Sequence, residues 1–139
     1  MEETALFTAA KKRLVGFAAT CKLELTDVKA GEVSGFCPIE EQLLNPYGFV
    51  HGGAVSTMMD TFGGMAASSA ASPPRYVVTR SADVHYLRPV EGRRMYGRAW
   101  AIKAGGQMCL VQSEIYDEKE RLCASGQLEF FYVEREVDG

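Results

Sequence analysis

Apolar side chains recur at helical spacing in two parts of the chain. Over residues 3–19 they fall every three or four positions, which predicts an amphipathic helix. Its apolar side holds Leu6, Phe7, Ala10, Leu14 and Phe17, and its polar side holds Lys11, Lys12 and Arg13. A second run, from about residue 52 to 71, consists of small and apolar residues and ends at Ser72-Pro73-Pro74. It predicts a long helix that the prolines terminate.

Most of the remaining chain alternates between apolar and polar residues, as strands do. Residues 21–29 and 32–38 predict a hairpin around Ala30-Gly31. Four later segments, separated by short turns, predict strands over 76–88, 93–104, 107–117 and 122–133. Because connections this short usually join antiparallel neighbours, we expect the last four strands to form an antiparallel meander.

The order of these elements is helix, hairpin, long helix and four strands, which favours an α+β fold with one antiparallel sheet. The long helix carries small or flexible residues such as Met58, Met65 and Ala66, so a curved sheet can wrap closely around it. We therefore expect the hotdog arrangement, an antiparallel β-sheet wrapped around a long central helix. A chain of 139 residues suits one domain over 1–139, with an N-terminal helix at about 3–19 and a core at about 20–133.

Composition narrows the class of protein. A net charge of −3 and a pI of about 5.4 give no global attraction for nucleic acid. The four cysteines are widely spaced and form no metal-binding pattern with the two histidines, so we expect reduced thiols, no metal and no cofactor. The acidic start, Met1-Glu2-Glu3, is unlike a signal peptide, and the long helix is a poor membrane span. We expect a cytoplasmic protein with no membrane partner.

One acidic residue, Asp60, stands alone in the long helix. Between residues 42 and 74 there is no Lys, Arg or Glu and no second Asp. A carboxylate without a local partner is costly to bury, so a chain that keeps one there usually uses it. Just before the helix, Gly52 and Gly53 offer backbone N–H groups where an anion or a developing oxyanion could sit. Together these features indicate chemistry on a carbonyl group.

Two motifs carry a family resemblance. The first is Asn45-x-x-Gly48-x-x-His51-Gly52-Gly53 followed by Asp60, and the second is a strand from Thr79 that ends in Tyr86-Leu87-Arg88-Pro89. In these motifs the chain resembles the PaaI-like acyl-CoA thioesterases of the hotdog superfamily, over about residues 20–133. It departs from the family pattern at Gly105-Gly106-Gln107, where the family often has Arg or Lys after a Gly.

The resemblance implies a role for each site residue. The Gly52 N–H would polarise the thioester carbonyl, and Asp60 would be the general base or nucleophile. Asn45 would hold the water or the sulfur side of the thioester, and Thr79 would orient the attacking water. His51 and Gly53 would shape the site, His51 through a hydrogen bond.

Each residue also has a purely structural interpretation. Asp60 could bond to a neighbouring hydroxyl or amide, and Thr79 is a good strand residue. Asn45 suits the first position of a type I turn, with Gly48 at the fourth. Gly52 and Gly53 could simply allow close entry into the helix.

Helix geometry sets a condition on this chemistry. Gly52 and Asp60 are eight residues apart, which is about 12 Å along a helix axis. A base must reach a water that itself lies about 3 Å from the carbonyl carbon, so the two residues of one chain cannot share a site. Two antiparallel helices in a twofold dimer would bring Gly52 of one subunit to Asp60 of the other. The resemblance further implies a dimer of dimers, hence a homotetramer.

The substrate needs two further sets of contacts. Coenzyme A carries several negative charges, and Arg88 and Arg93 are our candidates for its phosphates. Candidates for an acyl pocket, aromatic or short to medium aliphatic, are Tyr47, Phe49, Met59 and Phe62.

The sequence therefore predicts a thioester hydrolase that converts an acyl-CoA substrate to free acid and coenzyme A. Two alternatives remain open: a hotdog protein that binds acyl-CoA without turnover, and a dehydratase acting on a hydroxyacyl thioester. A dehydratase generally needs a catalytic His paired with an acid, and His51 is the one candidate near the helix.

Overall fold

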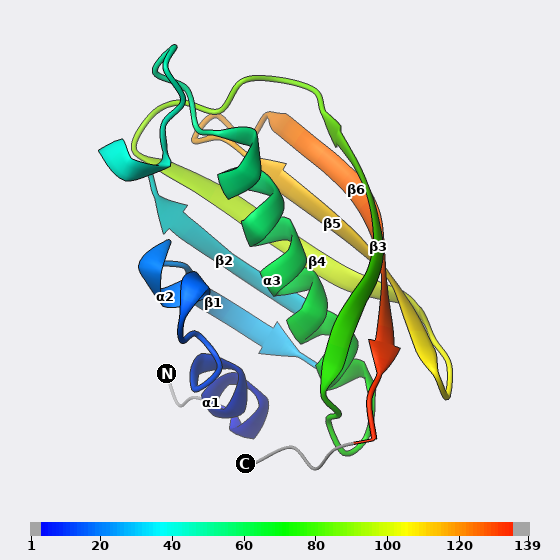
Figure 1. Ribbon diagram of the computed structural model, residues 1–139. Coiled ribbons are helices and arrows are strands. Elements are labelled where there is room, and N and C mark those ends of the chain that lie inside the picture. Colours follow the sequence, from blue (N-terminus) through cyan, green and yellow to red (C-terminus); the bar gives the residue numbers. More distant parts are fainter. Residues whose placement is uncertain (1–3, 135–139) are drawn as a thin grey trace.

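A long helix crosses one face of a curved six-stranded sheet (Figure 1). This computed structural model describes residues 4–134. Its helical elements are α1 (Ala5–Lys11), α2 (Phe17–Thr20), a 3₁₀ turn (Glu41–Leu43) and α3 (Gly52–Ala70). Its strands are β1 (Glu24–Lys29), β2 (Glu32–Pro38), β3 (Val77–Tyr86), β4 (Arg94–Ala104), β5 (Met108–Tyr116) and β6 (Leu122–Tyr132). The predicted α+β hotdog fold is confirmed, and the strand bounds lie within three residues of those expected.

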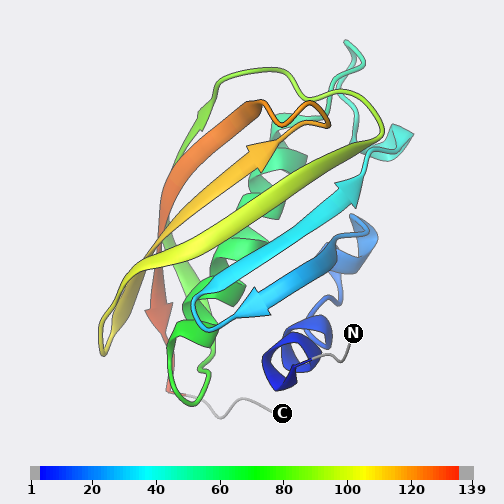
Figure 2. The same ribbon diagram turned by 180° about the vertical axis from the view of Figure 1, so that it is seen from behind.

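The sheet is antiparallel throughout and has the order β1-β2-β4-β5-β6-β3. The expected hairpin of β1 and β2 is present, as is a meander of β4, β5 and β6. The prediction that β3 lies beside β4 was wrong. Instead, β2 pairs with β4 at seven register positions, and β3 pairs with β6 at the far edge of the sheet (Figure 2). Residues 87–93 therefore carry the chain across the end of the sheet from β3 to β4.

Strand β3 is an exposed edge. It pairs with β6 on one side, and no described strand pairs with its other side. Large apolar side chains on it face solvent in this chain: Val78 is 51% exposed and Tyr86 is 55% exposed. A ten-residue edge strand with such residues is a surface suited to pairing with another chain.

Helix α3 packs very closely on the concave face of the sheet. Its sheet-facing side chains, among them Met58, Met59 and Phe62, are fully buried. Close approach requires glycine on the strands, since a Cβ at Gly35 would come within 2.6 Å of the Phe62 ring. Buried hydrogen bonds also hold the helix to the sheet, such as the 2.7 Å bond from the Tyr132 hydroxyl to the carbonyl of Ala67.

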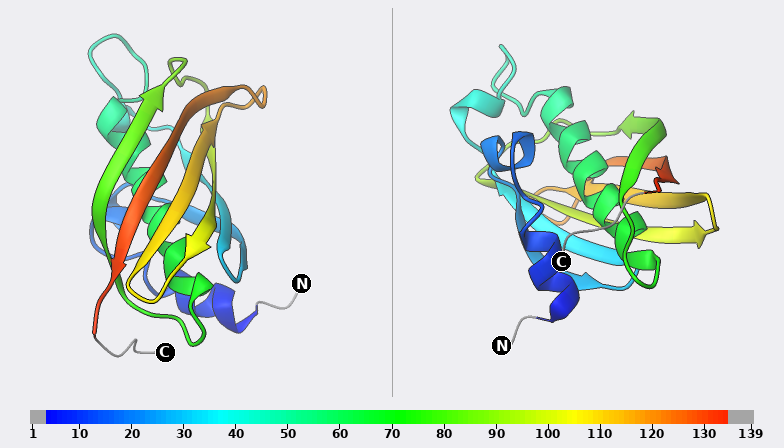
Figure 3. Two further views of the ribbon diagram at one scale, coloured as in Figure 1. Left: turned by 90° about the vertical axis from the view of Figure 1, so that its right-hand side faces the viewer. Right: turned by 60° about the horizontal axis from the view of Figure 1, so that its bottom comes forward.

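The N-terminal segment differs from the prediction. In place of one helix over 3–19, α1 and α2 are two short helices beside β1 and the end of α3 (Figure 3). Residue 3 lies outside the described part of the chain. Gly16 stands between the helices at a φ of 58°, a conformation that an α-helix cannot include. The break leaves Phe17 67% exposed and lets Arg13 reach α3.

No helix among residues 4–134 is both long enough and apolar enough to span a membrane.

Candidate active site

The loop before α3 is a compact turn organised by Asn45. The Asn45 Oδ1 accepts the N–H groups of Tyr47 at 2.9 Å and Phe49 at 3.1 Å. The Gly48 N–H donates to the Asn45 carbonyl at 3.1 Å, as expected for first and fourth turn positions. Because both side-chain partners are donors, they fix the amide orientation and leave the Nδ2 group as a donor.

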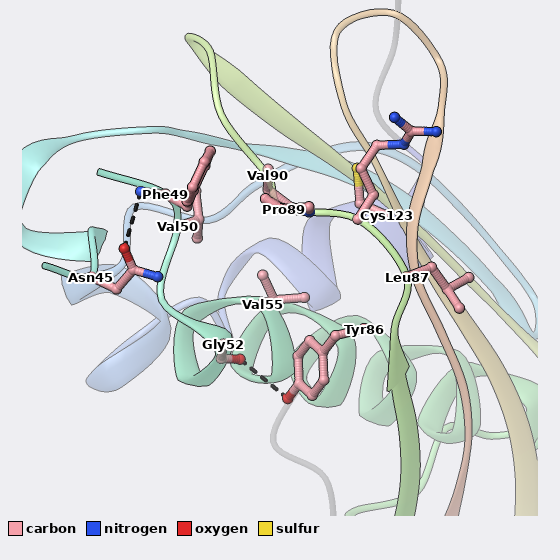
Figure 4. A pocket seen from close by; sticks show the side chains of 11 residues that line it. Asn45, Phe49, Val50, Gly52, Val55, Tyr86, Leu87, Pro89, Val90 and Cys123 are labelled. Carbon is pink, nitrogen blue, oxygen red and sulfur yellow. Dashed lines mark hydrogen bonds between the residues drawn. The ribbon is translucent and has the colours of Figure 1, made fainter. Parts of the chain in front are cut away.

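The first turn of α3 leaves one amide available. His51 caps the helix: its Nδ1 accepts the Gly53 N–H at 2.8 Å, and its carbonyl accepts the Ala54 N–H at 2.9 Å. No described residue accepts the Gly52 N–H. The Tyr86 hydroxyl donates to the Gly52 carbonyl at 3.3 Å, and its ring lies over this residue (Figure 4). Gly52 thus presents a fixed N–H donor at the positive end of the helix dipole.

A pocket of about 330 Å³, here called the helix-start pocket, opens beside this amide. Figure 4 shows Asn45, Phe49 and Gly52 on one side of it and Leu87 and Cys123 on the other. The full lining is Asn45, Phe49, Val50, Gly52, Val55, Tyr86, Leu87, Arg88, Pro89, Val90 and Cys123.

Two side chains on the far wall of this pocket have contrasting chemistry. Arg88 is exposed, and no carboxylate among residues 4–134 forms an ion pair with it. Cys123 is buried, and its thiol donates to the Arg121 carbonyl at 3.4 Å. Burial raises the pKa of the Cys123 thiol, and the neighbouring Asp117 carboxylate adds to the rise. The pocket wall therefore offers an available cation and an unreactive thiol.

Asp60 lies two turns further along α3 and faces a second depression. The Thr79 hydroxyl of β3 donates to Asp60 Oδ1 at 2.6 Å, a charge-assisted hydrogen bond. Asp60 is partly buried, and no described Lys or Arg forms an ion pair with it. The sequence placed both residues at the site, and the structure brings their side chains into direct contact.

This second depression, here called the acid groove, has a volume of about 220 Å³. It runs between α3 and the start of β3 and is lined by Arg13, Asp60, Thr61, Gly64, Met65, Ser68, Tyr76, Val77, Thr79 and Phe130. It shares no residue with the helix-start pocket. Within one chain, the donors near Gly52 and the carboxylate of Asp60 therefore serve separate depressions, as the helix spacing predicts.

Some expected substrate contacts lie elsewhere. Met59 and Phe62 have fully buried side chains, so in this chain they are core residues and not walls of an acyl pocket. Tyr47 is 84% exposed at the tip of the turn, whereas Phe49 does line the helix-start pocket. Arg93 lies at the other end of the 87–93 connection, where its N–H donates to the Glu118 carboxylate.

Arg13, Tyr76 and Tyr86 line the two depressions without having been proposed as site residues. Arg13 comes from the predicted polar side of the N-terminal helix, and Tyr76 is the first residue of a predicted strand. Tyr86 was counted only as part of a motif, and its contact with Gly52 depends on where β3 ends. The sequence of α3 holds a weak signal for the groove, because Asp60, Gly64 and Ser68 follow one another at four-residue intervals.

In the described part of the chain, no group of three His, Cys, Asp or Glu side chains is arranged to hold a metal ion.

The family model described as "Thioesterase superfamily" matches residues 47–124, which include Gly52, Asp60, Thr79 and Arg88. The chain belongs to the thioesterase superfamily. Membership in this superfamily confirms, at the level of the family, the expected class of thioester hydrolase.

Individual relatives agree with this membership. This chain is 28% identical to the proofreading thioesterase EntH of Klebsiella pneumoniae, over 74% of this chain and 75% of that protein. It is 29% identical to the 1,4-dihydroxy-2-naphthoyl-CoA hydrolase of Escherichia coli, over 66% of this chain and 67% of that one. The chain spans about two thirds of the length of the first curated relatives it matches. A solved thioesterase family protein from Silicibacter pomeroyi has a TM-score of 0.87 and 25% identity, covering 93% of this chain and 98% of that one.

Proposed function

We propose that this chain is an acyl-CoA thioesterase that hydrolyses an acyl-CoA, with an aromatic or a short to medium aliphatic acyl group, to a free acid and coenzyme A. The observation that carries the proposal is the Gly52 N–H, which no described residue accepts and which opens into the helix-start pocket. A fixed amide at a helix start stabilises the negative charge that develops on a carbonyl oxygen during attack.

Asp60 supplies the complementary group. As general base it removes a proton from a water molecule, and the resulting hydroxide attacks the thioester carbon. The carbonyl oxygen takes the charge and is held by the Gly52 N–H. As the tetrahedral intermediate collapses, the carbon–sulfur bond breaks, and the sulfur leaves with the proton that Asp60 accepted. If Asp60 attacks the carbon itself, an anhydride forms and water then cleaves it. A single turnover in ¹⁸O water separates the two routes, because the anhydride route can place the label in Asp60.

The site is completed by a second copy of the chain. Gly52 and Asp60 lie about 12 Å apart along α3, so one chain cannot bring both to one carbonyl. Two features support a twofold dimer: the unpaired β3 edge, and the α3 side away from the sheet, which includes the exposed Gly53. An antiparallel arrangement of two α3 helices gives two composite sites, and two such dimers would make the expected tetramer. Light scattering measures the mass of the assembly in solution and so distinguishes monomer, dimer and tetramer.

The remaining pocket residues have supporting roles in this proposal. The Asn45 Nδ2 group donates to the attacking water or to the sulfur side of the thioester, while its Oδ1 holds the turn. Thr79 keeps the Asp60 carboxylate aimed into the acid groove. Arg88 lies at the wall of the helix-start pocket and would pair with a phosphate of coenzyme A.

The test follows free thiol release from a panel of aromatic and aliphatic acyl-CoAs, with native protein and Asp60→Asn side by side. Asn keeps the shape of the side chain and removes the base, so we expect a loss of about 100-fold or more in kcat with little change in Tm. Binding without thiol release by native protein would contradict the proposal and favour an acyl-CoA-binding protein. A new conjugated double bond in the product would instead indicate dehydration.

A further inference from the structure

The acid groove continues well beyond the catalytic carboxylate. Asp60, Gly64 and Ser68 lie on one side of α3 at successive helical turns, and all three line the groove. From Asp60 to Ser68 the helix rises about 12 Å. The apolar side chains of Met65, Val77 and Phe130 form much of the remaining lining, together with the side chain of Thr61. The groove therefore has a carboxylate at one end and apolar side chains beside it.

A guanidinium stands at the other end. Arg13 lines the groove, and its Nη1 donates to the Ser68 hydroxyl at 2.6 Å. Its guanidinium carbon also lies 5.6 Å from the centre of the Tyr76 ring. The break between α1 and α2 brings Arg13 to this position, since a continuous helix would have kept it on the solvent side.

The positive charge of Arg13 at this end of the acid groove has no paired carboxylate among the described residues. Arg13 is partly buried, and among residues 4–134 no carboxylate forms an ion pair with it. Its partners among the described residues are the neutral Ser68 hydroxyl and the Tyr76 ring, which use only part of its five N–H donors. A guanidinium that is held in place, partly desolvated and lacks a carboxylate is a good receptor for one.

We propose that Arg13 is a specificity-determining residue, and that the acid groove takes an acyl group with a carboxylate at the end opposite the thioester. This inference rests on the proposed thioesterase function and narrows its substrate class. The apolar walls would bury the methylene chain, and the Arg13 guanidinium would pair with the terminal carboxylate. Without that pairing, an acid-ended acyl group would be disfavoured in a groove that already contains Asp60.

The decisive comparison uses two substrates with the same number of carbons. Suberyl-CoA carries a terminal carboxylate, and octanoyl-CoA carries a methyl group in its place. For native protein we expect kcat/KM to be at least about 10-fold higher for suberyl-CoA, the size of a charge-assisted hydrogen bond. In Arg13→Gln this preference should disappear, while kcat/KM for octanoyl-CoA stays within about threefold of native. Arg13→Lys keeps the charge and should retain part of the preference.

A matched control is Arg98→Gln, which removes an arginine that pairs with Glu32 on the sheet and lies in neither depression. It should keep the native preference. Equal kcat/KM values for the two substrates in native protein would overturn the proposal. So would an equal loss for both in Arg13→Gln, which would assign Arg13 a structural role.

Failure of the proposed function has a different signature. If native protein hydrolyses neither substrate, the same pair is compared by calorimetric binding to native protein and to Arg13→Gln. A tighter Kd for suberyl-CoA that Arg13→Gln abolishes would uphold the carboxylate receptor in a non-catalytic protein. Equal Kd values would overturn it.

Discussion

The two depressions along α3 are built in different ways. At the helix-start pocket the chain presents hydrogen-bond donors, and residues 43–53 hold them through local bonds such as those of Asn45 and His51. At the acid groove it presents an acceptor, Asp60, which is held by Thr79 from a strand at the far edge of the sheet. A donor half that is locally organised and an acceptor half that needs tertiary structure therefore share one helix, and the proposed mechanism needs both of them.

The largest loss of kcat should follow from removing the backbone N–H of Gly52. Gly52→Pro deletes this N–H at the first helical position, where proline is well tolerated, and His51 already has the extended conformation that a following proline requires. We expect kcat for thiol release to fall about 100-fold, as for other lost oxyanion donors.

Gly52→Ala is the matched control for this variant. It keeps the N–H, and its Cβ would meet the Tyr86 ring at an ordinary 3.6 Å. It should remain close to native in activity. A comparable loss in both variants would show that shape, and not the amide, matters here.

Mixing two inactive variants tests whether the halves come from different chains. Asp60→Asn and Gly52→Pro, unfolded and refolded together in equal amounts, should recover about one quarter of native activity, because half of the dimers are mixed and each holds one intact site of two. Each variant refolded alone is the control. Recovery no greater than the sum of the two controls would place both halves in one chain.

A smaller loss should follow from loosening the acceptor. Thr79→Val keeps the branched shape and the strand propensity but removes the hydrogen bond to Asp60. We expect kcat to fall about 10-fold, since a hydrogen bond to a charged group is worth about 1.5–3 kcal/mol. Thr79→Ser retains the hydroxyl and should lose much less. Native kcat in Thr79→Val would mean that Asp60 is positioned by the helix alone.

The smallest effect on catalysis should come from the helix cap. His51→Ala removes the acceptor of the Gly53 N–H and should lower the free energy of unfolding by about 1 kcal/mol in a urea titration. His51→Asn offers another capping acceptor and should recover most of that stability. A large fall in kcat for both variants, with stability retained, would give His51 a catalytic part.

The same contrast explains what could be predicted from the sequence. The turn at Asn45, the cap at His51 and the helix from Gly52 depend on neighbours within a few residues, so their pattern is visible in the chain. The pairing of β3 with β6 is not visible in the sequence, because β2 competes with β3 for the same edge of β4 and only the assembled sheet decides the order. The contact of Asp60 with Thr79 follows from that order.

Errors in the prediction have the same origin. Apolar periodicity continues through residues 3–19, and only the backbone conformation at Gly16 reveals the break that moves Arg13. Met59 and Phe62 have side chains suitable for a pocket, and their position on the sheet-facing side of α3 makes them core. The type of a side chain indicates whether it could line a pocket, but the face of the helix on which it lies decides whether it is buried in the core.

The buried cysteines have a practical consequence for the proposed chemistry. The proposed reaction frees a thiol beside the polypeptide, and Cys123 lies at the wall of the helix-start pocket. Exchange with disulfides and reaction with thiol reagents require a thiolate, and burial raises the pKa of Cys21, Cys109 and Cys123, and that of Cys37 to about 12. The cysteines of the folded protein should therefore react very slowly with a colorimetric thiol reagent, whereas free coenzyme A reacts at once. Release of coenzyme A can then be recorded continuously with little background signal from the protein.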